Sequence, residues 1–244
     1  MKGVILAGGL GTRLYPLTKV TNKHLLPVGR EPMIYNPIKQ LTTAGIRDIL
    51  IVTSKEHMGD IVGLLGSGEE FGCKFTFKVQ DKPSGIAHAL SLAEDFVQGG
   101  RIVVILGDNI MTHSIKPHVD SFRTQEKGAK VLLKKVGQPE RYGVVALDEH
   151  KKMIIQIEEK PNKPTSDYAV IGVYMYDSKV FDIIREIKPS KRGELEITSV
   201  NNAYNNLSEL SYDYINGEWT DAGTFDSLTQ ANEMLLRINN NIIS

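Results

Sequence analysis

Strand-like apolar runs recur along the first half of the chain and determine its predicted fold. They are GVILAG (3–8), DILIVTS (48–54), RIVVILGDN (101–109) and AKVLLKKV (129–136). The first three are continuous rather than alternating, which is typical of parallel strands covered on both faces. Helical spacing of apolar residues predicts one helix after Pro32 that stops at Gly45 and another that begins at the N-cap Ser84 and ends before Gly99. Alternating strands and helices favour a doubly wound α/β sheet.

The second half of the chain shows strands with few helices between them. These strands are YGVVALD (142–148), MIIQIEEKP (153–161) and YAVIGVYMYD (168–177). They predict antiparallel additions to the same sheet or a small second layer. A last helix is expected after Thr224, over about 225–240, because Phe225 begins an apolar stripe that ends at Ile238. No repeat or linker divides the chain, so residues 1–244 are expected to form a single domain.

Composition describes an ordinary soluble protein and excludes several classes. Hydrophobic residues make up 41% and charged residues 24%. Lys+Arg and Asp+Glu both total 29, so the formal net charge is zero and neither nucleic acid nor a membrane is an expected partner. The single cysteine, Cys73, permits no intrachain disulfide and is expected to be a buried small hydrophobic residue. Because neither a signal peptide nor a membrane-length apolar run is present, we expect a cytoplasmic protein.

A glycine-rich loop, GGLGTR, directly follows the first predicted strand. Gly8, Gly9 and Gly11 lack a Cβ, so an anion can approach their backbone N–H groups closely. The loop is not a P-loop, which needs lysine where Gly9 stands, nor a dinucleotide fingerprint, which needs glycine where Leu14 stands. Two interpretations remain open from these residues alone: a phosphate loop that ends in Arg13, or a structural turn with a surface arginine.

Motifs in a fixed order carry a resemblance that covers nearly the whole chain. They are LAGGLGTRLYPLT, NKHLLPVGREPMI, VQDKPSGIAHAL, LGDN, PERYGVV, EEKP, YAVIGVYMYD, RGELEIT and WTDAGT. The chain resembles the sugar-1-phosphate nucleotidyltransferases and is most similar to the glucose-1-phosphate thymidylyltransferases among them. The resemblance implies a Rossmann-like nucleotidyltransferase fold, with a mostly parallel mixed sheet flanked by helices and a small antiparallel sugar-binding part. It divides the chain into a nucleotide-binding half, about 1–110, and a sugar-binding half, about 111–224.

The resemblance also implies a reaction in which dTTP and glucose-1-phosphate give dTDP-glucose and pyrophosphate, with Mg²⁺ as cofactor. Arg13 and Lys23 would hold the triphosphate, Lys160 the sugar phosphate, and Asp108 and Asp221 the metal ion, and these are the predicted catalytic residues. Positioning and electrostatics carry most of such catalysis, so no covalent nucleophile is needed. Without the resemblance, the ordinary interpretation of Lys23 would be a lysine on the surface, and that of Asp108 and Asp221 an aspartate that caps a turn or a helix.

Further residues are assigned to the two substrates by the same resemblance. The nucleotide would contact Leu6, Ala7, Gly8, Gly9, Gly11, Thr12, Arg13, Lys23, Gln80, Pro83, Gly85 and Asp108. The sugar phosphate would contact Asn109, Tyr142, Gly143, Glu159, Lys160, Val170, Tyr174 and Trp219. The amide of Gln80 can donate and accept, as a pyrimidine edge requires, although a solvent-facing strand end is the alternative. The histidines show no spacing typical of a metal site.

Several positions depart from the family pattern. His24 stands where the family usually has glutamine, Ser199 where it has aspartate, and Ala222 where it has threonine. The chain also lacks the usual C-terminal extension, and MTHSIKP follows GDNI in place of the usual YGHG segment. We therefore expect a short form with weak or absent feedback control, which is still a homo-oligomer.

Two alternatives to dTTP-dependent synthesis remain open. One is the same chemistry with UTP or another sugar-1-phosphate, because a glutamine contact cannot by itself exclude uracil. The other is a non-catalytic regulatory relative that binds sugar nucleotides, which would predict decay at the catalytic positions. Arg13, Lys23, Asp108, Lys160 and Asp221 are all present, which disfavours it.

Overall fold

The computed structural model describes residues 1–148, 150 and 153–243, which divide into two compact units. The first, called here the glycine-loop unit, comprises Lys2–Pro83, Ile105–Pro117 and Asn216–Ser244. The second, the mixed-sheet unit, comprises Met1, Ser84–Val104 and His118–Ile215. Each unit is therefore assembled from segments far apart in the sequence. The boundaries fall inside β6 (Ile102–Leu106) and α5 (Lys116–Thr124).

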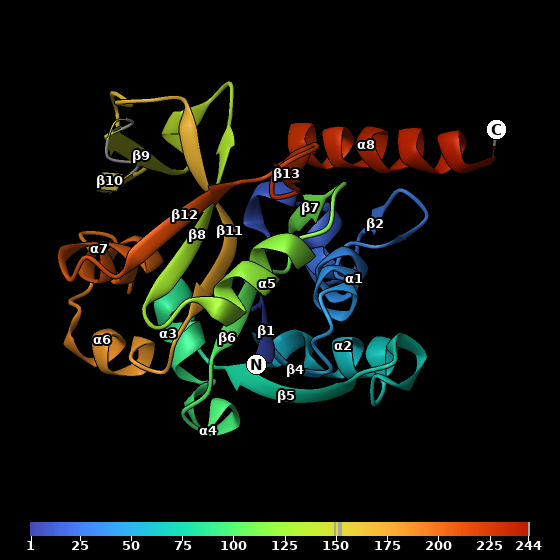
Figure 1. The fold of residues 1–244 in the computed structure, drawn as a ribbon. Coiled ribbons are helices and arrows are strands. Elements are labelled where there is room, and N and C mark those ends of the chain that lie inside the picture. The colour runs from blue at the N-terminus through green and yellow to red at the C-terminus, as the bar shows by residue number, and fades with distance from the viewer. Residues whose placement is uncertain (149, 151–152, 244) are drawn as a thin grey trace. The chain divides into compact units, whose positions relative to one another are not determined.

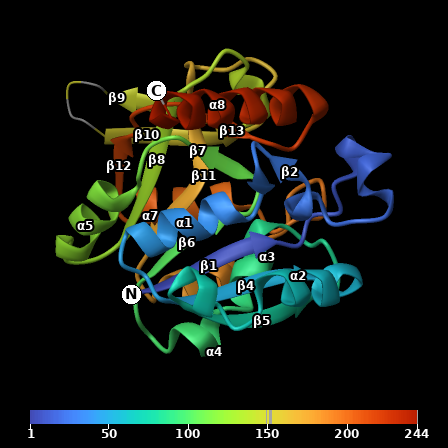
Figure 2. The same ribbon diagram turned by 90° about the vertical axis from the view of Figure 1, so that its right-hand side faces the viewer.

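Parallel strands form the centre of the glycine-loop unit. They are β1 (Lys2–Ala7), β4 (Asp48–Ser54) and β5 (Lys74–Gln80), with β4 between the other two. β1 and β4 are buried along almost their whole length, as continuous apolar runs predict for parallel strands. Figure 2 shows the strands side by side, with α1 (Tyr35–Thr43) beside β1 and α2 (Met58–Leu65) beside β4 and β5.

Further elements complete this unit. They are the 3-10 helices η1 (Thr12–Leu14), η2 (Leu17–Lys19), η3 (Lys23–Leu25), η4 (Lys55–His57) and η5 (Glu69–Phe71), the antiparallel pairs β2 (Pro27–Val28) with β3 (Glu31–Pro32) and β7 (Asn109–Met111) with β13 (Trp219–Asp221), and the helix α8 (Phe225–Ile243). α8 begins where the apolar stripe after Thr224 predicts a helix. Its Ala231 is buried in a core cluster with Leu14, Met33 and Ile110. This packing requires a large apolar side chain at position 14, where a dinucleotide fingerprint would have glycine.

The strands that lie wholly within the mixed-sheet unit have the order β10-β9-β11-β8-β12. The strands are β8 (Ala129–Lys135), β9 (Gly143–Asp148), β10 (Met153–Glu159), β11 (Tyr168–Tyr176) and β12 (Leu210–Tyr214). Only β8 and β12 pair in parallel, and the other neighbours are antiparallel. The expectation of antiparallel strands in the second half is therefore confirmed.

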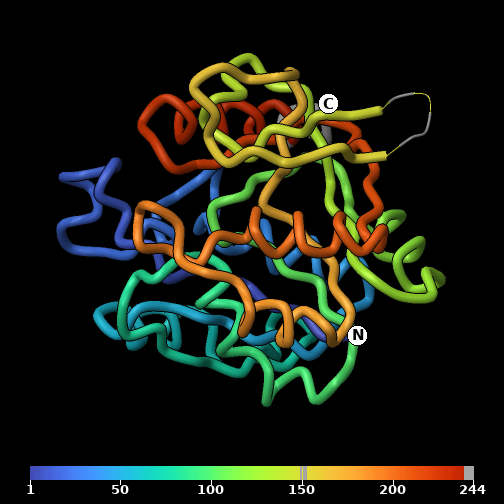
Figure 3. Tube along the Cα trace, turned by 90° about the vertical axis from the view of Figure 1, so that its left-hand side faces the viewer, coloured from blue at the N-terminus to red at the C-terminus, as the bar shows by residue number. Residues whose placement is uncertain are grey.

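The helices that lie wholly within this unit are α3 (Ile86–Ser91), α4 (Glu94–Val97), α6 (Val180–Glu186), α7 (Ile197–Asn206) and the 3-10 helix η6 (Pro139–Arg141). The sequence pattern predicted a helix over the region of α3 and α4, but not α6 or α7. α6 and α7 are neighbours, as Figures 1 and 3 show. The sequence of α7, ITSVNNAYNN, is poor in strong helix formers, so packing of the buried Val200 and Tyr204 stabilises this helix.

The helix predicted from Ser84 to Gly99 differs from the structure in two ways. It is interrupted between α3 and α4, and its N-cap is Gly85 rather than Ser84. Gly85 has φ +102°, and a Cβ there would lie 2.4 Å from the carbonyl oxygen of Leu195. Ser84 accepts a hydrogen bond from the Leu195 N–H through its own carbonyl (2.9 Å), so the helix begins where the Leu195 backbone allows it.

Cys73 is half-buried rather than buried, and desolvation raises the pKa of its thiol. Its predicted role as a core residue is therefore only partly correct, because it lies just before β5 begins at Lys74. Among the residues that the structure describes, no helix has both the length and the apolar character needed to span a bilayer.

Candidate active site

The glycine loop lies where side chains would collide with its neighbours. A Cβ at Gly8 would lie 2.7 Å from Oε1 of Gln80, the last residue of β5. Gly11 has φ +66°, and the Thr18 hydroxyl donates to its carbonyl at 2.8 Å. Local packing thus leaves no room for a side chain at Gly8 or Gly11, and the conformation of Gly11 also disfavours one.

Lys23 and Asp108 form an ion pair and hydrogen bond beside this loop. Lys23 is the first residue of η3, and Asp108 follows β6. Their side chains are only 12% and 13% exposed. Burial by itself would raise the pKa of Asp108, but the Lys23 charge and the hydrogen bonds from Lys23 and Asn109 outweigh it and hold that pKa well below its usual range. Asp108 is therefore ionised at neutral pH.

Asp221 and Arg13 lie close to this pair in the same unit. Asp221 is paired with Asn109 in the β13–β7 ladder, and the Ala222 N–H donates to the Asp108 carbonyl at 2.8 Å. A Cβ at Gly223 would lie 2.9 Å from Nη2 of Arg13 and 3.4 Å from Oδ2 of Asp221. The glycine-loop unit thus brings Arg13, Lys23, Asp108 and Asp221 together from three separate segments of the chain.

Trp219 and Asn109 form a hydrogen-bonded chain that ends on Asp108. Nε1 of Trp219 donates to Oδ1 of Asn109 at 2.8 Å, and Nδ2 of Asn109 donates to Oδ1 of Asp108 at 3.1 Å. Both side chains are buried, so they hold the carboxylate from its protein side. Their predicted contact with the sugar phosphate stays a prediction.

The mixed-sheet unit carries a second cluster around Glu159, the last residue of β10. Gly143 pairs with Glu159 on one side and with Val170 on the other, so these three residues lie side by side on adjacent strands. The Thr198 hydroxyl donates to Oε2 of Glu159 at 2.6 Å. The other carboxylate oxygen, Oε1, lies 3.5 Å from Nζ of Lys160.

Lys160 has a left-handed backbone, with φ +46°. Its N–H donates to the Tyr142 carbonyl at 2.9 Å, which holds the residue in this conformation directly after β10. A non-glycine residue in this region costs about 1 kcal/mol, and such strain tends to occur at functional positions. Its side chain is 48% exposed and free to approach a ligand.

Arg192 belongs to this cluster, although it was not among the residues predicted from the sequence. Its Nη2 lies 3.6 Å from Oε1 of Glu159 and makes contacts of 2.9 and 3.0 Å with the two carboxylate oxygens of Glu196. The signal in the sequence that could have indicated a role for Arg192 is its position as the cation of the motif RGELEIT. Arg192 and Lys160 together place two positive charges beside Glu159.

Not all predicted site residues join these clusters through the contacts described above. Tyr174 lies further along β11 than Val170, is buried, and stacks on Tyr176 with ring centroids 6.2 Å apart. Gly85 belongs to the mixed-sheet unit, whereas the other residues predicted to bind the nucleotide, including Leu6, Ala7, Thr12 and Pro83, belong to the glycine-loop unit. Within the described part of the chain, no three His, Cys, Asp or Glu side chains gather as a metal site.

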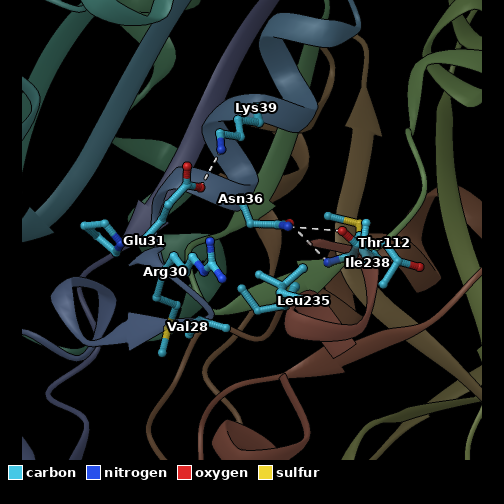
Figure 4. A pocket seen from close by; sticks show the side chains of 12 residues that line it. Val28, Arg30, Glu31, Asn36, Lys39, Thr112, Leu235 and Ile238 are labelled. Carbon is cyan, nitrogen blue, oxygen red and sulfur yellow. Dashed lines mark hydrogen bonds and ion pairs between the residues drawn. The ribbon is translucent and has the colours of Figure 1, made fainter. Parts of the chain in front are cut away.

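A cavity of about 460 Å³ lies elsewhere in the glycine-loop unit (Figure 4). Arg30 and the apolar side chains of Leu235 and Ile238 are among those that line it. The Asn36 side chain holds its wall through two hydrogen bonds of 3.1 Å with the backbone of Met111. None of the predicted site residues lines this cavity.

Known proteins resemble this chain over most of its length. The nucleotidyl transferase family model matches residues 2–238. A glucose-1-phosphate thymidylyltransferase of Xanthomonas campestris is 46% identical over 94% of this chain and 79% of its own, and one of Neisseria meningitidis is 42% identical over 98% and 84%. A Bacillus anthracis protein assigned as a glucose-1-phosphate thymidylyltransferase, solved with sucrose, is 60% identical, with a TM-score of 0.93 over 97% of this chain and 95% of its own.

These matches confirm two predictions from the sequence. The first is the fold class, a mostly parallel mixed sheet flanked by helices with small antiparallel sheets. The second is the resemblance that the motifs carry. The chain belongs to the nucleotidyl transferase family.

Proposed function

We propose that the chain transfers a thymidylyl group from dTTP to glucose-1-phosphate and releases pyrophosphate. The observation that carries the proposal is the buried Lys23–Asp108 pair beside the glycine loop, with Arg13 and Asp221 against Gly223. This is a set of fixed charges suited to an anionic triphosphate. The names of relatives at 42% and 46% identity support dTTP and glucose-1-phosphate as the substrates.

In the proposed reaction, a phosphate oxygen of glucose-1-phosphate attacks the α-phosphorus of dTTP in line. The new P–O bond forms as the bond to the β-phosphate bridging oxygen breaks, and pyrophosphate leaves with that electron pair. Arg13, Lys23 and the N–H groups of the glycine loop offset the charge of the triphosphate and of the departing pyrophosphate. Gln80 lies against Gly8 and is the residue proposed to contact the base.

Glucose-1-phosphate would be bound by the cluster around Glu159. Lys160 and Arg192 are the cations proposed to hold its phosphate, and Arg192 offers several donors in a fixed geometry. The Glu159 carboxylate would accept from sugar hydroxyls. Thr198 already occupies one side of its Oε2 and so fixes the orientation of the carboxylate.

Asp108 and Asp221 would hold Mg²⁺. The donor set fits this ion, which takes one or two carboxylates together with phosphate oxygens and waters. Bound Mg²⁺ neutralises charge on the phosphates. The chain's own residues prepare for it: the low pKa of Asp108 keeps this carboxylate ionised, and Asn109 with Trp219 fixes its direction.

A pyrophosphate-release assay that crosses nucleoside triphosphates with a panel of sugar-1-phosphates tests the function. We expect the highest kcat/KM for dTTP with glucose-1-phosphate. Preference for UTP, or for another sugar, would replace the proposed substrates while keeping the reaction. Absence of release with every pair would contradict the proposal. Asp108→Asn should abolish Mg²⁺-dependent turnover and leave the circular dichroism spectrum unchanged, and near-normal turnover would remove Asp108 from its role.

A further inference from the structure

A buried histidine lies directly behind the Lys23–Asp108 pair. His24 is only 1% exposed, and its backbone N–H donates to Oδ1 of Asn22 at 2.9 Å. The same oxygen lies 2.6 Å from Nδ1 of the His24 ring. Asn22 in turn donates from Nδ2 to the Ala7 carbonyl at 3.4 Å, which fixes the amide orientation. Because an amide oxygen only accepts, the ring donates from Nδ1, and Nε2 keeps its lone pair.

The other edge of the ring packs against Gly107. A Cβ at Gly107 would lie 2.6 Å from Cδ2 and 3.1 Å from Nε2 of His24. The Gly107 N–H donates to the Leu6 carbonyl at 2.9 Å, so the backbone cannot easily retreat from the ring. A Cβ would also lie 3.2 Å from the Leu6 carbonyl oxygen, so glycine is required at this position chiefly by the imidazole and secondly by the backbone of β1.

Consecutive residues of η3 thus contact consecutive residues of the turn after β6. His24 packs on Gly107, and Lys23 pairs with Asp108. The His24 carbonyl also accepts from the Ile34 N–H at 2.9 Å, which ties η3 to the segment before α1. The edge of the ring therefore lies between η3 and the turn and contributes to the separation between them.

We propose that His24 is a positioning residue that fixes the Lys23 ammonium and the Asp108 carboxylate relative to each other, without contacting either substrate. The inference rests on the proposed function, and it gives a role to a position where the family usually has glutamine. A neutral ring suits this role, because burial first and the Lys23 charge second lower the pKa of His24 to about 3. No proton transfer through His24 is involved.

The test uses His24→Ala and His24→Gln in the full chain. We expect His24→Ala to lower kcat about tenfold or more, as loss of a residue that orients a metal ligand does, with little change in the KM for dTTP. A readout besides activity is Mn²⁺ binding followed by electron paramagnetic resonance, which should weaken about tenfold. His24→Gln should restore most of both, because its flat carboxamide can donate to Asn22 and lie on Gly107.

Gly107→Ala provides a second, independent variant. Alone it should lower kcat and Mn²⁺ affinity, since its methyl group collides with the ring. Combined with His24→Ala, the loss should be smaller than the sum of the two single losses. Additive losses would mean that the ring and Gly107 act separately, which overturns the proposal.

His113→Ala is the matched control, because His113 also packs on a glycine of the same unit. A Cβ at Gly217 would lie 1.9 Å from its Nδ1. This variant should keep its kcat and Mn²⁺ affinity. A raised KM for dTTP at unchanged kcat in His24→Ala would show that His24 binds nucleotide and would overturn the proposal, as would unchanged Mn²⁺ affinity. These outcomes can be told apart from failure of the proposed function. In that case the unsubstituted chain would release no pyrophosphate, while the Mn²⁺ measurements would still test the role of His24.

Discussion

The charged clusters of the two units differ in how tightly the protein holds them. In the glycine-loop unit, the Lys23 and Asp108 side chains are 12% and 13% exposed and contact each other directly. In the mixed-sheet unit, Lys160 and Arg192 are 48% and 44% exposed and lie 3.5 and 3.6 Å from Glu159. The first cluster is preorganised by burial, whereas the cations of the second are about half exposed to solvent.

This contrast has an energetic side. Half-exposed ion pairs such as Lys160–Glu159 contribute about 0 to 1 kcal/mol, so replacing one partner changes stability little. A buried pair is different, because removal of one partner leaves a charge without compensation. Substitutions in the buried Lys23–Asp108 pair should therefore lower the stability of the fold. Substitutions in the cluster around Glu159 should instead lower the affinity for substrate.

The largest expected effect is that of Lys23→Met, which removes the cation of the buried pair. It should abolish measurable turnover and lower the free energy of unfolding by about 3 kcal/mol, at the low end for such pairs because Asn109 still donates to Asp108. Burial would then raise the pKa of Asp108, so the loss of stability should shrink as the pH falls. Urea unfolding at several pH values measures this.

The double variant Lys23→Met/Asp108→Asn is its control. Removing both charges should return most of the lost stability, since no uncompensated charge remains, while turnover stays absent. If the double variant unfolds as easily as Lys23→Met, the destabilisation comes from packing of the lysine stem, and the pair is not the preorganised element described above.

Lys160→Ala should have the next largest effect, and the opposite character. We expect the KM for glucose-1-phosphate to rise about tenfold or more, because a charge-assisted contact contributes about 1.5 to 3 kcal/mol, with little change in the KM for dTTP. Steady-state kinetics with each substrate varied in turn measures both constants. Equal increases in the two constants would contradict the assignment of Lys160 to the sugar phosphate.

The pH dependence of stability should reveal His24. Its pKa is about 3 in the folded chain, against an ordinary value of 6.5. Between these values the unfolded chain binds a proton that the folded chain does not, so stability falls as the pH drops below 6.5, by up to about 1.4 kcal/mol per pH unit. His24→Gln should make the free energy of unfolding depend less on pH between pH 6.5 and 5 than it does in the parent chain. The same pH dependence in both proteins would show that the folded histidine takes up the proton.

The sequence predicted the elements whose pattern is strong and local. β1 and β4 follow from continuous apolar runs, and α8 follows from its apolar stripe. α7 escaped prediction because asparagine-rich sequence has weak helix propensity, and its stability comes from residues distant in the chain. The N-cap at Gly85 rather than Ser84 was missed for the same reason, since only its contact with the Leu195 backbone shows why the helix begins there.

Site residues could be named from the sequence where residue chemistry and motif agreed, but not where packing decides which side chains meet. Lys23 and Asp108 could be named from motifs, but their direct contact could not, because 85 positions separate them. Arg192 was overlooked since its motif gave no indication that it reaches Glu159. His24 was recognised only as a departure from the family. Its role depends on Asn22 and Gly107, whose contacts with the ring appear only in three dimensions.

The smallest expected effect concerns the backbone of Lys160, and it separates strain from charge. Lys160→Ala keeps a side chain at φ +46°, whereas Lys160→Gly removes the Cβ that disfavours this region. Both variants lose the ammonium, so both should bind glucose-1-phosphate equally weakly. The glycine variant should nevertheless unfold at higher urea, with a free energy of unfolding about 1 kcal/mol above that of the alanine variant. Equal stability of the two variants would mean that the left-handed backbone at position 160, held by the Tyr142 hydrogen bond, is not strained. The greater solvent exposure of Lys160 would then be the remaining difference between it and Lys23.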